Sequence, residues 1–133
     1  MTAQDRNLVQ LCFYGKLKEV RDAIADGASV NRKGHRNSTC LIAAVVSCHW
    51  DIVSLLLEHP EIEVNAKDDN NQTAILIACE IGTIEVIRLL LARGANPNER
   101  GLNGDTCLMV AVGGRLTRHV EVVSLCWSSQ ISI

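Results

Sequence analysis

The sequence is poor in aromatic residues and in proline. Its 133 residues include two Trp, one Tyr, one Phe and two Pro, although 47% of the chain is hydrophobic. The core must therefore consist of Leu, Ile, Val and Ala, which suit thin helical layers repeated along the chain. At this length the chain corresponds to one domain.

Neither sign of charge dominates, and long apolar runs are missing. The formal net charge is −2 and no Lys/Arg run exceeds two residues, which argues against nucleic acid or a membrane surface as the partner. No stretch approaches the about 20 apolar residues of a membrane-spanning helix. The polar residues 1–7 lack the apolar region of a signal peptide. We therefore expect an intracellular, monomeric protein of the cytoplasm, with the nucleus as the alternative.

The six cysteines form no Cys-x-x-Cys motif, so neither a zinc knuckle nor a redox pair is predicted. Cys40 and Cys107 each follow a Thr, and Cys48 stands where Gly15 and Gly82 stand in neighbouring segments. In an intracellular chain this pattern predicts buried, free, structural thiols.

What the chain does contain is a sequence pattern of about 33 residues that recurs in register. Thr39, Thr73 and Thr106 begin successive copies of this pattern, and Asn31 and Asn65 end copies of it. A period of this size predicts a stack of small units that share one core. Such a stack offers an extended surface rather than a catalytic pocket, so binding is the expected activity.

One unit shows how each copy of the pattern is expected to fold. The polar segment 68–72 predicts a hairpin-like loop, and Thr73 is a good N-cap for an apolar helix over 74–80. Gly82 then ends that helix with left-handed geometry. A second helix with one wide apolar face follows over 84–93, and Gly94 stops it.

These features resemble the ankyrin-repeat family. Thr73-Ala74-Ile75-Leu76 stands where that family has Thr-Pro-Leu-His, followed by Gly82, a Leu-rich helix and Gly94-Ala95-Asn96-Pro97-Asn98. The match covers about residues 8–127, whereas the tetratricopeptide repeat, with the same period, needs a Trp-x-x-Leu-Gly signature that is absent. The resemblance implies an all-α solenoid of helix-turn-helix units joined by hairpin-like loops. We expect one domain over 1–133, with an N-terminal cap over 5–33, repeats over 34–67 and 68–100, an incomplete repeat over 101–127 and a tail over 128–133.

The chain also departs from the family pattern. No copy keeps Pro-Leu-His, whose imidazole is bonded within and between repeats in the family, so we predict a less rigid stack. The last unit has three extra residues between Val112 and His119, and no polar cap follows Trp127. This suggests a truncated or alternatively terminated array, an expectation that burial of Leu125 and Trp127 would contradict.

No residue pattern supports catalysis, a cofactor or a metal. His49 and His119 share one repeat position, which favours a structural role, and no His has a ligand partner at the right spacing. A nucleophile elbow and a phosphate-binding glycine loop are missing. The family resemblance implies one modification, hydroxylation of Asn65.

The predicted partner surface follows from the family, which presents its loop tips and first helices as a concave groove. Projected onto this chain, the surface comprises His35, Arg36, Ser38, Asp69, Asn70, Gln72, Leu102, Asn103 and Asp105 from the tips and Ser47, Glu80 and Ile81 from the first helices. Trp50 is either an interface anchor or a cover for the seam between repeats.

We therefore predict a non-enzymatic protein–protein interaction module, a scaffold or adaptor that binds no nucleic acid, membrane, small-molecule substrate or cofactor. One alternative is a regulatory or targeting part of a larger protein, such as a ubiquitin-ligase adaptor or a kinase. Another is a truncated product without independent function. The fold alone cannot name the partner.

Overall fold

The protein is described by a computed structural model over residues 3–101, 103–107 and 109. This part of the chain contains α-helices and one short 3₁₀ turn, η1 (His35–Asn37), and no strand. The helices are α1 (Ala3–Tyr14), α2 (Leu17–Ala25), α3 (Cys40–Val46), α4 (Trp50–Glu58), α5 (Ala74–Ile81) and α6 (Ile84–Ala92). The predicted all-α class is confirmed.

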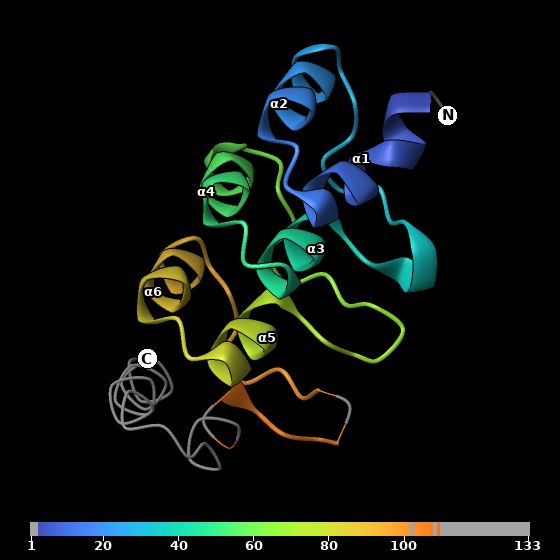
Figure 1. Ribbon diagram of the computed structural model, residues 1–133. Coiled ribbons are helices and arrows are strands. Elements are labelled where there is room, and N and C mark those ends of the chain that lie inside the picture. Colours follow the sequence, from blue (N-terminus) through green and yellow to red (C-terminus); the bar gives the residue numbers. More distant parts are fainter. Residues whose placement is uncertain (1–2, 102, 108, 110–133) are drawn as a thin grey trace.

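The helices stack in two columns (Figure 1). The first helices α1, α3 and α5 form one column, and the second helices α2, α4 and α6 form the other, with contacts along and between the columns. Three loops project from the first-helix column on the side away from the second helices. We call them tip 1 (residues 34–38), tip 2 (68–72) and tip 3 (101 and 103–105).

Helices α3 and α5 and the segment after Thr106 each begin at a threonine, as predicted. The Thr39 hydroxyl accepts from the Ile42 N–H at 3.1 Å, and Thr73 accepts from Leu76 at 3.4 Å. Thr106 accepts from the Met109 N–H at 3.4 Å in the same way. All three threonines are buried, so their hydroxyls satisfy backbone donors that water does not reach.

The turn after each first helix requires left-handed backbone. Gly15, Cys48 and Gly82 occupy it with φ of 76°, 61° and 86°, a region where glycine alone is free of Cβ strain. Cys48 is exposed, so the prediction of a buried thiol is wrong at this position. It is correct for Cys12, Cys40 and Cys79, which are buried thiols outside any disulfide.

The core is aliphatic, as the composition predicts. Leu41 and Ile75 occupy one buried column, and Val53 and Ile87 occupy another. Ala44 and Ala78 have no exposed surface, consistent with a position that must be small. Their partners Leu108, Ala111 and Val123 in the fourth unit lie outside the described residues, as do Leu125 and Trp127. Cys107 is buried and disulfide-bonded, contrary to the prediction of a free thiol.

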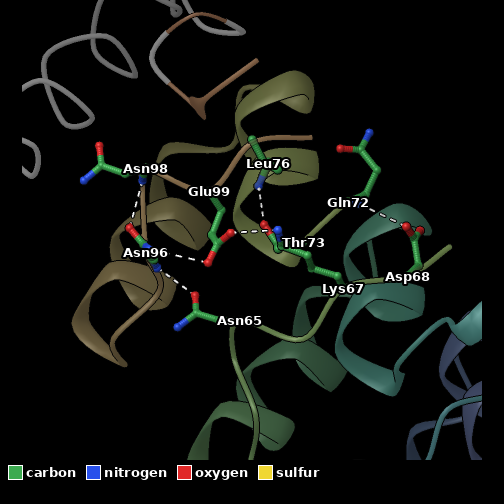
Figure 2. A network of polar contacts seen from close by, with 9 residues as sticks. All are labelled: Asn65, Lys67, Asp68, Gln72, Thr73, Leu76, Asn96, Asn98 and Glu99. Atoms are coloured by element: carbon green, nitrogen blue, oxygen red, sulfur yellow. Dashed lines mark hydrogen bonds and ion pairs between the residues drawn. The ribbon is translucent and has the colours of Figure 1, made fainter. Parts of the chain in front are cut away.

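The closing asparagines connect successive units. Asn31 donates to the Glu61 carbonyl at 2.7 Å and accepts from the Glu63 N–H at 2.8 Å. Asn65 repeats this pattern with the Gly94 carbonyl at 3.1 Å and the Asn96 N–H at 2.7 Å. Figure 2 shows the bond from Asn65 to Asn96 beside the Lys67–Glu99 ion pair, which measures 2.9 Å. The recurring Asn is therefore a joint between units.

The predicted structural role of His49 is also visible. Its Nε2 lies 3.0 Å from the Phe13 carbonyl of the preceding unit. The ring covers Gly15, where an added Cβ would lie only 2.6 Å from His49 Cε1. The His and the Gly therefore form a matched pair across the boundary between two units.

Candidate partner-binding surface

Tips 1 and 2 lie next to one another and are connected by hydrogen bonds. The Arg36 carbonyl accepts from the Asp69 N–H at 3.0 Å, and the Asn37 side chain donates to the Asp69 carboxylate at 2.6 Å. Lys33 extends the same connection to the Lys67 carbonyl at 2.8 Å. Tip 1 and tip 2 therefore hold each other in place.

Each tip closes on itself by a repeated pattern. The first residue donates its N–H to the carbonyl of the last, at 2.8, 3.1 and 2.9 Å in tips 1, 2 and 3. Asn37, Asn71 and Gly104 take the left-handed position, with φ of 58°, 59° and 75°. In tip 2, Asp68 accepts from the Asn70 and Gln72 N–H groups at 2.8 and 3.0 Å, and Figure 2 shows the bond to Gln72. The scaffold is regular while its side chains vary.

The structure brings most of the predicted surface residues to the tips and the first-helix column. His35, Arg36, Asp69, Asn70, Asn103 and Asp105 are exposed at the tips, and Ser38 and Gln72 are half-buried there. Glu80 is exposed on α5, Ile81 at the end of α5 is half-buried, and Ser47 is half-buried at the C-cap of α3. Leu102 lies outside the described residues.

Trp50 belongs to a different part of the molecule. It is the first residue of α4, half-buried, and packed against the core. With residues 82–86 it lines a pocket of about 250 Å³ between α4 and the start of α6. This location supports the seam-covering interpretation and separates Trp50 from the tips.

Two surface residues were missed by the sequence interpretation, which treated the first unit as a solvent-facing cap. Phe13 and Tyr14 on α1 are 48% and 68% exposed, and their rings meet edge-to-face with centroids 5.3 Å apart. In repeat register Phe13 corresponds to Val46 and Glu80, and Tyr14 corresponds to Ser47 and Ile81. This register was the available signal, because Ser47, Glu80 and Ile81 at the equivalent positions are predicted surface residues.

Beside this aromatic pair lies a pocket of about 300 Å³, which we call the corner pocket. Val9, Gln10, Phe13 and Tyr14 of α1 form one wall. Tip 1 contributes Gly34, His35 and Ser38, and α3 contributes Ala43. The corner pocket thus joins two predicted surface residues, His35 and Ser38, to the aromatic pair.

Charge changes along the exposed surface. His35 and Arg36 lie on tip 1, whereas Asp69 lies on tip 2, Asp105 on tip 3 and Glu80 on α5. The surface is therefore basic next to the corner pocket and acidic along the following units. A partner that matches it must carry the opposite order of charge.

The described part of the chain contains no group of three or more His, Cys, Asp or Glu residues that could hold a metal ion. The buried thiols are also unsuited to nucleophilic chemistry. Burial raises the pKa of Cys79 to about 12, and a hydrogen bond with Cys40, followed by burial, raises the pKa of Cys12. Both therefore stay protonated and unreactive near neutral pH. Among the described helices, none has the length and apolar character that crossing a bilayer would require.

Comparison with known proteins identifies the repeat from which this architecture is built. The family model for ankyrin repeats in three copies matches residues 60–131, and the single ankyrin-repeat model matches residues 36–69. A probable E3 ubiquitin-protein ligase, XBOS32, of Oryza sativa subsp. japonica is 35% identical over 114 residues, which cover 83% of this chain and 23% of the relative. A putative ankyrin repeat-containing protein of Treponema pallidum is 32% identical over 109 residues, covering 82% of this chain and 37% of the relative.

A third relative is a cation channel. The human transient receptor potential cation channel subfamily A member 1 is 32% identical over 82 residues, which cover 62% of this chain and 7% of the relative. The chain thus spans between 7% and 37% of the length of these three relatives. Their names differ widely, although each is similar to this chain over at least 62% of this chain's length. By its recurrent units, its stacked helix pairs and the match over more than half of its length, the chain belongs to the ankyrin-repeat family.

Proposed function

We propose that the chain is a protein–protein interaction module, a scaffold or adaptor, that binds a protein partner along its tips and first helices. Ankyrin repeats are generally interaction modules rather than catalytic folds. The observation that carries the proposal is the continuous surface formed by tips 1 to 3 and the exposed ends of α1, α3 and α5. It combines Phe13, Tyr14 and Val46, each about half exposed or more, with charged residues on the tips.

The chemistry of this surface supports a protein as its partner. Exposed aromatic residues beside polar and charged groups are typical of protein interfaces. The hydrogen bonds between tips 1 and 2 hold this part of the surface in one shape, which lowers the entropy lost on binding. A net charge of −2 gives no general attraction for nucleic acid.

The test is affinity capture with charge-reversed variants. We expect Asp69→Arg with Glu80→Arg to lose the proteins captured by the wild-type chain. The matched control is Glu58→Arg with Glu85→Arg, which makes the same charge change at exposed positions of α4 and α6 in the second-helix column. Circular dichroism checks that both variants fold. Equal capture by both double variants would contradict the proposal.

A second candidate role has its own support. This segment spans between 7% and 37% of the length of the relatives reported above, and one of them is named as a probable ubiquitin ligase. The chain would then be the regulatory or targeting segment of a larger protein. Immunoblotting of the endogenous product tests this, because a band near 14.5 kDa contradicts it and a much larger band supports it.

A further inference from the structure

We propose that the corner pocket receives one large apolar side chain of an extended partner peptide, and that a neighbouring acidic residue of that peptide pairs with Arg36 and His35. The proposal rests on the interaction function proposed above and specifies the chemistry of the partner. Its occupant is a segment of another protein with an apolar anchor next to Asp or Glu.

The size and lining of the corner pocket determine which kind of side chain can serve as the anchor. A volume of about 300 Å³ is at the lower end for ligand sites, so it suits one side chain better than a cofactor. Val9, Phe13 and Ala43 supply apolar walls, and the exposed rings of Phe13 and Tyr14 lose contact with water when an apolar side chain covers them. This removal from water is the driving force for the anchor.

The repeat register explains why space opens at this corner. Gly34, Ser38 and Ala43 correspond to Asp68, Gln72 and Ile77 one unit later. All three residues are smaller at the first corner. Val9 fills the place beside Gly34, where an added Cβ would lie 3.1 Å from Val9 Cβ, so the open space comes from Ser38 and Ala43. Ala43 in particular lacks the branched side chain of Ile77, which is 8% exposed. The corner pocket therefore results from sequence differences in one unit of an otherwise regular scaffold.

The residues at the rim of the corner pocket determine which groups the rest of the peptide must carry. Gln10 and Ser38 offer an amide and a hydroxyl, which can bond the peptide groups of an extended chain. Arg36 is exposed, and its backbone is fixed because its carbonyl accepts from the Asp69 N–H at 3.0 Å. The Asp69 carboxylate accepts from the Asn37 amide at 2.6 Å, so that carboxylate already has a hydrogen-bond partner on tip 1.

Charge complementarity therefore selects an acidic neighbour for the anchor. Arg36 presents a fork that matches a carboxylate. Farther along the surface Asp69, Glu80 and Asp105 disfavour continued negative charge. A peptide whose acidic residue lies near the anchor and whose distal part is neutral or basic fits both ends of the surface.

The test is selection of a random dodecapeptide display library against the full chain. We expect the enriched peptides to share an aromatic or large aliphatic residue next to Asp or Glu. A synthetic peptide with the enriched sequence is then titrated by fluorescence anisotropy. Ala43→Ile, which copies the residue at position 77, and Phe13→Ala should each raise its Kd about tenfold. Arg36→Gln should raise Kd about fivefold and reduce its salt dependence.

Matched controls come from the second-helix column. Leu89→Ala removes an apolar side chain that is 43% exposed on α6, and Arg88→Gln removes an exposed cation from the same helix. Both should leave Kd unchanged. Circular dichroism checks the fold of Ala43→Ile, and Phe13→Ala changes an exposed side chain, so the proposal stays testable if the first variant unfolds.

Three outcomes overturn the proposal: no enrichment over the naive library, an enriched sequence without acidic residues, or an unchanged Kd in both Ala43→Ile and Phe13→Ala. These are distinguishable from failure of the interaction function. If capture of cellular proteins is lost in the Asp69/Glu80 variant while Ala43→Ile and Phe13→Ala retain it, the chain binds proteins but not through the corner pocket.

Discussion

At the scale of single residues, conformation matters as much as identity. The same left-handed turn is occupied by glycine in the first and third units and by Cys48 in the second, with φ of 61°. A Cβ in this region costs about 1–2 kcal/mol relative to ordinary helical backbone. Because Cys48 is exposed, little packing offsets that cost.

We therefore predict that Cys48→Gly stabilises the protein by about 0.5–1 kcal/mol, since part of the relief is offset by the greater flexibility of glycine in the unfolded chain. Urea unfolding should show a higher midpoint with an unchanged slope. Gly82→Ala, at φ 86°, should shift the midpoint the opposite way. A lower midpoint for Cys48→Gly would show that the Cys side chain makes a favourable contact.

Buried thiols give a second residue-scale prediction, on pH. Burial raises the pKa of Cys79 from 9.0 to about 12, so between pH 9 and 12 the unfolded chain releases a proton that the folded chain retains. Stability should therefore fall as pH rises through this window, by at most about 1.4 kcal/mol per pH unit for this one group.

Urea unfolding under reducing conditions at pH 7, 9 and 10.5 measures this effect. Cys79→Ala should fall less steeply than the wild-type chain above pH 9, after each is referred to its own value at pH 7. Cys12 contributes in the same direction, because its hydrogen bond with Cys40 and its burial raise its pKa. Parallel curves for the wild type and Cys79→Ala would contradict the assignment.

At the scale of elements, the joints between units depend on side-chain-to-backbone hydrogen bonds. Asn65 accepts from the Asn96 N–H and donates to the Gly94 carbonyl, so one side chain links its own turn to the turn of the next unit. Thr39 and Thr73 similarly start their helices by accepting one backbone N–H each.

Replacing Asn65 by Ala should destabilise the protein by about 1–2 kcal/mol, because two hydrogen bonds between units are lost. Asn70→Ala is the matched control, since Asn70 is exposed at tip 2 and its backbone N–H bonds to Asp68. Urea unfolding of both variants gives the comparison. Equal midpoints for the two would mean that the joint adds nothing measurable.

Much at this scale was predictable from sequence because it repeats. Thr73 and Gly82 mark helix boundaries through local chemistry, and recurrence identified the stacked helix pairs. The corner pocket was not predictable in this way, because it arises from small residues on tip 1 and α3 beside the exposed rings of α1, and these elements meet only after folding. Phe13 and Tyr14 were missed since the first unit was considered only as a cap, and the exposure of Cys48 depends on the turn around it.

At the scale of the whole molecule, stability is distributed along the stack. Helix α3 packs between α1 and α5 and also against α4, whereas α1 has only one neighbour in its own column among the described helices. In such arrays, stability is close to a sum over units and their interfaces. The missing Pro-Leu-His leaves a less rigid stack as our prediction.

Hydrogen exchange followed residue by residue should therefore show the slowest amides in α3, with earlier opening of α1, and thermal unfolding should be broad. The buried α3 residues 41–45 are the reporters, compared with the exchange of α1 residues 8–14. A sharp, heat-resistant transition with uniform protection from α1 to α6 would show that the stack opens as one cooperative body.

The bonds between tip 1 and tip 2 have a consequence for association kinetics. Asp69 receives a hydrogen bond from Asn37 and donates its own N–H to the Arg36 carbonyl, so the two loops are locked before any partner arrives. A ligand that contacts both loops meets a preassembled receptor and does not wait for a loop closure. Differences in affinity among such ligands should consequently appear in their dissociation rates rather than in their association rates.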